Sequence, residues 1–104
     1  SGKGMPASLT MARLLAEFRV SAVTADDPAE VLSRLNESMV KHSQRGIFCT
    51  IAYIQVDVAT GRMRCANAGH HPAVVVSPSG ARFFGEASGP PVGVVSWVTW
   101  DVVE

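Results

Sequence analysis

The sequence predicts an α+β fold in which two N-terminal helices pack on an antiparallel β-meander. Apolar residues recur at helical spacing as far as about residue 42. Beyond residue 46 the pattern changes to short runs rich in β-branched and aromatic residues, separated by turn residues. Because the helices all precede the strands, this order favours an α+β arrangement over alternating β-α-β units. With 104 residues the chain holds one domain at most.

The first helix is expected to begin near Met5 or Pro6, because proline is favoured at the first helical position. Its apolar face is expected to include Leu9 and Leu15, and the helix to end near Arg19. The following residues, "VSAVTADD", are predicted to form a loop.

The second helix has clear start and stop signals. Asp27 and Pro28 form a cap and first-turn pair, which predicts a helix from residue 29 to about residue 42. Gly46 is the expected breaker after its last turn. Apolar residues recur along one face of this segment, so that face is expected to contact the strands.

The second half of the chain is predicted to be strands joined by turns. The expected strands are residues 47–58, 62–69, 73–77 and 81–84, and a last one over residues 96–104. Trp97 and Trp100 have opposite parity in that last strand, so one is expected to face the core and the other a partner or the missing part of the domain. Both ends of the chain look cut, so we expect part of a larger domain.

Composition narrows the function classes. Nine basic and nine acidic residues give a formal net charge of zero, which disfavours a nucleic-acid or membrane-surface binder. The sequence has no apolar run long enough to span a bilayer and no signal peptide at its start, so a cytoplasmic location is expected.

The two cysteines are expected to be free and buried. Cys49 and Cys65 form no C-x-x-C pair and have no zinc-like spacing. A hairpin that turns at residues 59–60 would place Cys65 opposite Ile54 and not opposite Cys49.

Two glycine-containing motifs are candidates for a site. "SGKGMPAS" places a lysine and glycines at a helix N-terminus, where free N–H groups favour phosphate, although the spacing is not that of a P-loop. "NAGHHP" places His70 and His71 in a turn after a strand. Each motif has a plainer interpretation, a turn that needs only its glycine, and on the motif alone that interpretation is favoured.

Several segments in order resemble the metal-dependent (PPM-type) protein serine/threonine phosphatases of the stage II sporulation protein E (SpoIIE) family. The matching segments are "SGKGMPASLTMARL", "PAEVLSRLNESM" with Leu35-Asn36, "GIFCTIAYIQVDVATGRMRCANAGHHPAVVV" with Phe48 and Thr50, and "SGPPVGV" with Gly89, Pro91 and Gly93. The resemblance covers the chain from Ser1 to about Glu104, and the order of the motifs makes it specific.

This resemblance implies an α-β-β-α phosphatase sandwich, of which residues 1–104 would be a single partial domain, truncated at both ends. In the family, Mn²⁺ or Mg²⁺ ions activate a water that attacks the phosphorus of phosphoserine or phosphothreonine. Carboxylates of the family hold these ions. Their positions precede Ser1 and follow Glu104, so the resemblance assigns no metal ligand to this chain.

The resemblance implies instead a set of residues that border the site. These are Ser1, Gly2, Lys3, Gly4, Gly69 and His70. Lys3 stands where many members have histidine and would meet substrate phosphate as a point charge. His70 would face the site as a supporting or accessory-metal group, with His71 as its uninvolved neighbour.

The function implied by the resemblance is dephosphorylation of a regulatory phosphoprotein of the anti-sigma-factor-antagonist type. The alternative is a non-catalytic or degenerate relative that acts as a binding module in the same partner-switching circuit. A small-molecule-binding α+β domain unrelated to phosphatases is the least favoured interpretation. Apolar strand edges would also favour self-association as a dimer.

Overall fold

The computed structural model describes residues 5–42 and 46–104, and its element order confirms the α+β prediction. Two helices come first, α1 (Met5–Thr24) and α2 (Pro28–His42). Four strands follow: β1 (Ile51–Val56), β2 (Met63–Ala68), β3 (Ala73–Ser77) and β4 (Gly80–Phe84). Neither helix in these described ranges is long and apolar enough to cross a membrane.

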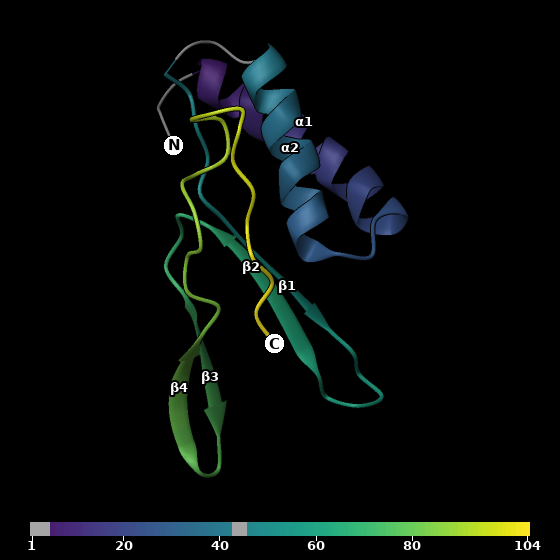
Figure 1. Ribbon diagram of the computed structural model, residues 1–104, viewed down its shortest axis with the longest axis vertical. Helices are drawn as coiled ribbons and strands as arrows, with labels where there is room; N and C mark the ends of the chain where they lie inside the picture. Colours follow the sequence, from purple (N-terminus) through teal and green to yellow (C-terminus); the bar gives the residue numbers. More distant parts are fainter. Residues whose placement is uncertain (1–4, 43–45) are drawn as a thin grey trace.

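The strands form two separate hairpins where the sequence predicted one meander. β1 pairs with β2 and β3 pairs with β4, each antiparallel, in two-stranded sheets. The helices pack at one end of the molecule, and the β3–β4 hairpin extends away from them toward the other end (Figure 1). The longest dimension is 45 Å. The accessible surface of 6733 Å² exceeds the about 5,600 Å² expected for a compact protein of this mass, because the second hairpin projects.

Helix α1 is five residues longer than predicted, so the loop expected from residue 20 was wrong over most of its length. The Thr24 hydroxyl donates to the Val20 carbonyl, and the Ala25 N–H donates to the Ser21 carbonyl at 2.8 Å. Ser21 and Ala25 are both buried. Burial of this last turn therefore outweighs the weak helix propensity of its valines and threonine.

The buried stripe of α1 also differs from the predicted one. Leu14 is buried and Phe18 packs against the core, at i and i+4, and Ser21 continues the stripe. Leu9 and Leu15, which were expected to face the core, are 64% and 54% exposed. Apolar residues occur on more than one side of this helix, so the sequence pattern could not show which side packs against the core.

Helix α2 supplies the centre of the core and begins as predicted. The Asp27 carboxylate accepts a hydrogen bond from the Ala29 N–H at 2.8 Å, which satisfies one free donor of the first turn. Its buried residues are Pro28, Val31, Leu32, Leu35, Asn36 and Met39. This face packs against β1 and β2, as expected from its periodicity.

The first hairpin has the predicted register. Cys65 lies opposite Ile54, both cysteines are free, and both are buried. β1 is shorter than the predicted strand 47–58, because Cys49 pairs with Val92 of a later loop through two backbone hydrogen bonds of 2.9 and 2.8 Å.

The strand predicted over residues 96–104 is absent except for one bridge, Val103 to Cys65. The indole of Trp100 donates to the Pro90 carbonyl at 3.0 Å, and the Asp101 N–H donates to the Ser88 hydroxyl. These contacts hold the segment against the loop, so it does not form a ladder along β2. Trp100 is buried and Trp97 is 82% exposed, but this difference does not come from strand parity, because the segment is not a strand.

Replacing Leu32, which is fully buried, by alanine should lower the free energy of unfolding by about 3 kcal/mol, because it removes buried methyl groups and leaves a cavity. The matched control Leu9→Ala, on exposed helix surface, should change it by less than about 0.5 kcal/mol. Urea denaturation followed by circular dichroism measures both. Equal losses for the two variants would contradict the described core.

Both cysteines should resist thiol reagents in the folded protein. Burial raises the pKa of the Cys49 and Cys65 thiols above the ordinary value of 9.0, so the reactive thiolate is scarce at neutral pH. Native protein should react slowly with a disulfide reagent, and denatured protein fully. Because folding retains these two protons, the free energy of unfolding should fall as pH rises above about 9. Rapid labelling of native protein would contradict this.

Candidate functional site

A buried asparagine closes the turn that carries the histidines. Asn67 lies near the end of β2 and is 1% exposed. Its side-chain oxygen accepts from the His70 N–H at 2.8 Å, and its amide N–H groups donate to the carbonyls of His70 at 3.0 Å and Gly85 at 2.7 Å. Every polar group of this side chain thus has a backbone partner, which is the condition for burying an amide.

Gly69 is required at its position for two separate reasons. Its φ of +67° lies in the left-handed region that side chains with a Cβ avoid. A Cβ at Gly69 would also lie 2.9 Å from the backbone nitrogen of Pro91. The turn therefore packs directly against the loop that contains Pro91.

The His70 ring is held by Thr50 from the neighbouring strand segment. Nδ1 of His70 lies 2.8 Å from the Thr50 hydroxyl oxygen. The register of β1 and β2 explains this, since Ile51 pairs with Ala68 and the next residues outward are Thr50 and Gly69. The hairpin thus brings together the Thr50 and Ala-Gly-His motifs of the sequence.

A second asparagine fixes the loop beside this turn. The Asn36 side chain, on α2, accepts from the Gly93 N–H at 2.7 Å and donates to the Val95 carbonyl at 2.9 Å. Ala68 and Gly89 form a bridge on the other side of the loop. The Gly-x-Pro-x-Gly segment is therefore held between α2 and the end of β2.

Asn67 and Asn36 were not predicted as site residues, although both lay within matching motifs. Each stands among buried apolar neighbours, Asn67 in β2 and Asn36 on the core face of α2. A lone amide in such a run signals a side chain that must find backbone partners, and that signal was available in the sequence.

Of the six predicted site residues, the structure places Gly69 and His70 in the turn after β2. Ser1, Gly2, Lys3 and Gly4 lie outside the described residues. Helix α1, which follows them, lies beside the segment that leads into Thr50, because the thiol of Cys49 lies 3.8 Å from the sulfur of Met11. Cys49 directly precedes Thr50.

The described residues do not fit a metal ion by themselves. Within residues 5–42 and 46–104, no three His, Cys, Asp or Glu side chains gather closely enough to hold one. The Asp57 carboxylate accepts instead from the Ala59 N–H at 3.0 Å and so stabilises the β1–β2 turn.

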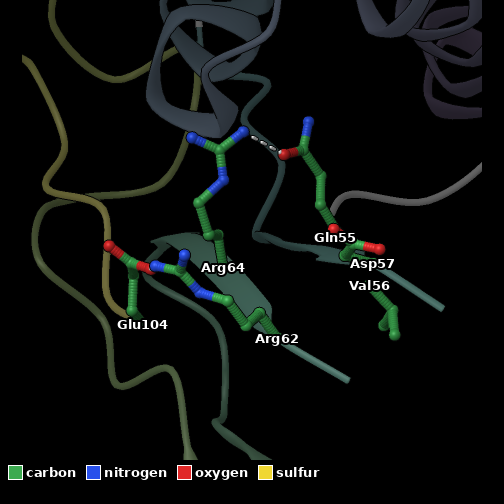
Figure 2. Close-up of a pocket in the computed structure, with 6 residues that line it drawn as sticks. All are labelled: Gln55, Val56, Asp57, Arg62, Arg64 and Glu104. Atoms are coloured by element: carbon green, nitrogen blue, oxygen red, sulfur yellow. Dashed lines mark hydrogen bonds and ion pairs between the residues drawn. The ribbon is translucent and has the colours of Figure 1, made fainter. Parts of the chain in front are cut away.

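An open polar pocket of about 550 Å³ lies at the other end of the β1–β2 hairpin, lined by Gln55, Val56, Asp57, Arg62, Arg64 and Glu104 (Figure 2). The Arg64 guanidinium donates to the Gln55 side-chain oxygen at 2.6 Å, and Arg62 forms an ion pair with Glu104. Two cations face two carboxylates, so the pocket has no net charge to attract an anion. It lies about 20 Å along β2 from His70.

The described site is thus a fixed histidine turn at one end of a hairpin, beside a glycine- and proline-containing loop. Comparison with known families agrees with the motif order. The profile of the family described as "Stage II sporulation protein E (SpoIIE)" matches residues 1–104, and the chain belongs to this family.

Two curated relatives come from Bacillus subtilis (strain 168). Phosphoserine phosphatase RsbP is 28% identical over 97 residues, which cover 89% of this chain and 24% of the relative. Phosphoserine phosphatase RsbU is 29% identical over 94 residues, which cover 89% of this chain and 28% of the relative. The chain therefore spans about a quarter of the length of these relatives. No solved structure matches it.

The two reasons for Gly69 can be separated by a matched control. Gly61 also has a positive φ, +76°, but has open space where its Cβ would lie. Gly61→Ala should therefore cost only the backbone strain, about 1 kcal/mol. Gly69→Ala should cost about 2–4 kcal/mol, because the backbone of Pro91 must also shift. Urea denaturation compares the two, and equal costs would contradict the close approach of turn and loop.

Proposed function

We propose that the chain is part of a metal-dependent phosphatase domain that removes phosphate from phosphoserine or phosphothreonine of a regulatory protein. The observation that carries the proposal is the match of the SpoIIE family profile to residues 1–104. Two relatives named as phosphoserine phosphatases support the phosphoserine part. By the resemblance of the motifs, the substrate is of the anti-sigma-factor-antagonist type, and the location is the cytoplasm.

In this proposal residues 1–104 form a partial domain that supplies the margin of the active site. Carboxylates outside the chain would hold the Mn²⁺ or Mg²⁺ ions, and the bound ions would supply an activated water. Ser1, Gly2, Lys3 and Gly4 border the phosphate, with Lys3 as a point charge. Gly69 and His70 are also proposed to border the site, supported by the hydrogen bonds of the turn.

His71 is proposed to be uninvolved. Its ring meets that of His70 edge-on, with centroids 6.1 Å apart. The His70 ring, by contrast, lies within hydrogen-bond distance of the Thr50 hydroxyl, and this contact fixes its orientation. His71 is therefore a suitable control position in the same turn.

The alternative is a non-catalytic member that binds its phosphoprotein partner without hydrolysing it. Both proposals expect the described residues to gather no metal-binding group, so they differ in whether the carboxylates proposed to lie outside this chain are present. Self-association as a dimer is compatible with both proposals. The hairpins leave strand edges exposed, together with apolar side chains such as Val76 and Phe83.

Calorimetric titration with Mn²⁺ and turnover of p-nitrophenyl phosphate test the proposal on the same samples. A protein of residues 1–104 should show neither tight metal binding nor metal-dependent turnover. The full-length gene product should show both. In the full-length protein, His70→Ala should lower turnover about tenfold, the order of one lost hydrogen bond to a charged group, and His71→Ala should leave it within about twofold.

Either of two results would contradict this account. Clear Mn²⁺-dependent turnover by residues 1–104 that falls with His70→Ala would show a metal site within this chain. Tight phosphoprotein binding by the full-length protein without any turnover would favour the binding-module alternative.

A further inference from the structure

The two ring nitrogens of His70 have different surroundings. Nδ1 lies 2.8 Å from the Thr50 hydroxyl oxygen, within hydrogen-bond distance. Nε2 is on the far side of the ring and points away from Thr50. The His70 residue as a whole is exposed, so a ligand that meets this ring meets it at Nε2.

The direction of the bond to Thr50 decides what Nε2 offers. If Thr50 donates to Nδ1, the neutral ring carries its proton on Nε2 and offers a donor. If Nδ1 donates to Thr50, Nε2 offers a lone pair, which is what a metal ion requires. In the first arrangement the hydroxyl hydrogen of Thr50 is donated to the Nδ1 lone pair, so both groups are satisfied by one hydrogen bond. The second leaves that hydrogen to find another acceptor.

The backbone of the turn fixes the ring relative to Thr50. Asn67 binds both the N–H and the carbonyl of His70, at 2.8 and 3.0 Å. Gly69 packs against the Pro91 backbone, so the turn cannot slide along the hairpin. The side chain of His70 therefore leaves the backbone from a fixed point, and the hydroxyl of Thr50 fixes its remaining rotation.

We propose that Thr50 is a positioning residue that donates to Nδ1 of His70 and holds the Nε2–H tautomer, so that His70 presents an N–H donor to an oxygen of the substrate phosphate. Phosphate oxygens are acceptors and match a donor. The resemblance implied either a supporting role or an accessory-metal role for His70. This proposal gives His70 the supporting role, as a contact to phosphate, and excludes ligation of a metal through Nε2. The role toward substrate rests on the proposed function, whereas the tautomer does not.

The tautomer is measured directly by nuclear magnetic resonance. Full-length protein with ¹⁵N only in histidine is recorded at about pH 8, because a tautomer is defined only for a neutral ring. Long-range ¹H–¹⁵N correlations should show His70 as the Nε2–H tautomer, with His70→Asn identifying its signals. Thr50→Val, which keeps the shape and removes the donor, should give a mixture of tautomers. Thr50→Ser should restore the original pattern, and the His71 signals should stay unchanged in every variant.

Phosphate contact and turnover are separate readouts. Inorganic phosphate added to the protein should shift the Nε2 signal of His70 more than that of His71. Thr50→Val should lower kcat/KM for a phosphoserine peptide about tenfold, and Thr50→Ser should keep it within about twofold. Rescue by serine distinguishes loss of the hydroxyl from a general disturbance of the hairpin.

Three results would overturn the inference: an Nδ1–H tautomer in the unmodified protein, a tautomer unaffected by Thr50→Val, or a phosphate shift no larger at His70 than at His71. The proposed function fails separately. Absence of turnover with an intact Nε2–H tautomer and phosphate shift would reject catalysis and support the positioning of His70. Turnover with an Nδ1–H tautomer would support catalysis and reject the assigned role of Thr50.

Discussion

The hydrogen bonds of the Asn67 side chain are the constraint on which the site depends. Asn67 is 1% exposed, and its amide joins the histidine turn to the exit of the β3–β4 hairpin at Gly85. The backbone carbonyl of Asn67 accepts from the Ser88 N–H at 3.1 Å, which also connects the loop after β4 to this residue. A buried amide is costly unless its groups are paired, so these segments are tied to one another through one residue.

Asn36 likewise uses side-chain hydrogen bonds, in this case to connect helix α2 to the loop. Its amide joins α2 to the backbone of Gly93 and Val95, while apolar neighbours on the same helix face make the core. Apolar packing is non-directional and would allow the loop to shift along α2. Hydrogen bonds require defined distances and angles, so the two asparagines give the loop and the turn a fixed relative position.

Much of the element pattern was predictable because its causes are local. The cap of Asp27 on α2, the turn after Asp57 and the opposite placement of Cys65 and Ile54 all follow from residues near in sequence. Non-local pairing caused the errors. β1 begins late because Cys49 pairs with Val92, and the final segment meets β2 at one bridge because Trp100 is held by the loop.

The sequence by itself determined the α+β order, the register of the first hairpin and the motif order that identifies the family, because periodicity, caps and turn residues act over a few positions. It also identified Gly69 and His70 as candidate site residues. Only the tertiary structure decided that Thr50 meets Nδ1 of His70, and that the Asn67 amide donates to the Gly85 carbonyl. These contacts join residues 20 and 18 apart in the sequence, and no local pattern encodes the direction in which such side chains point.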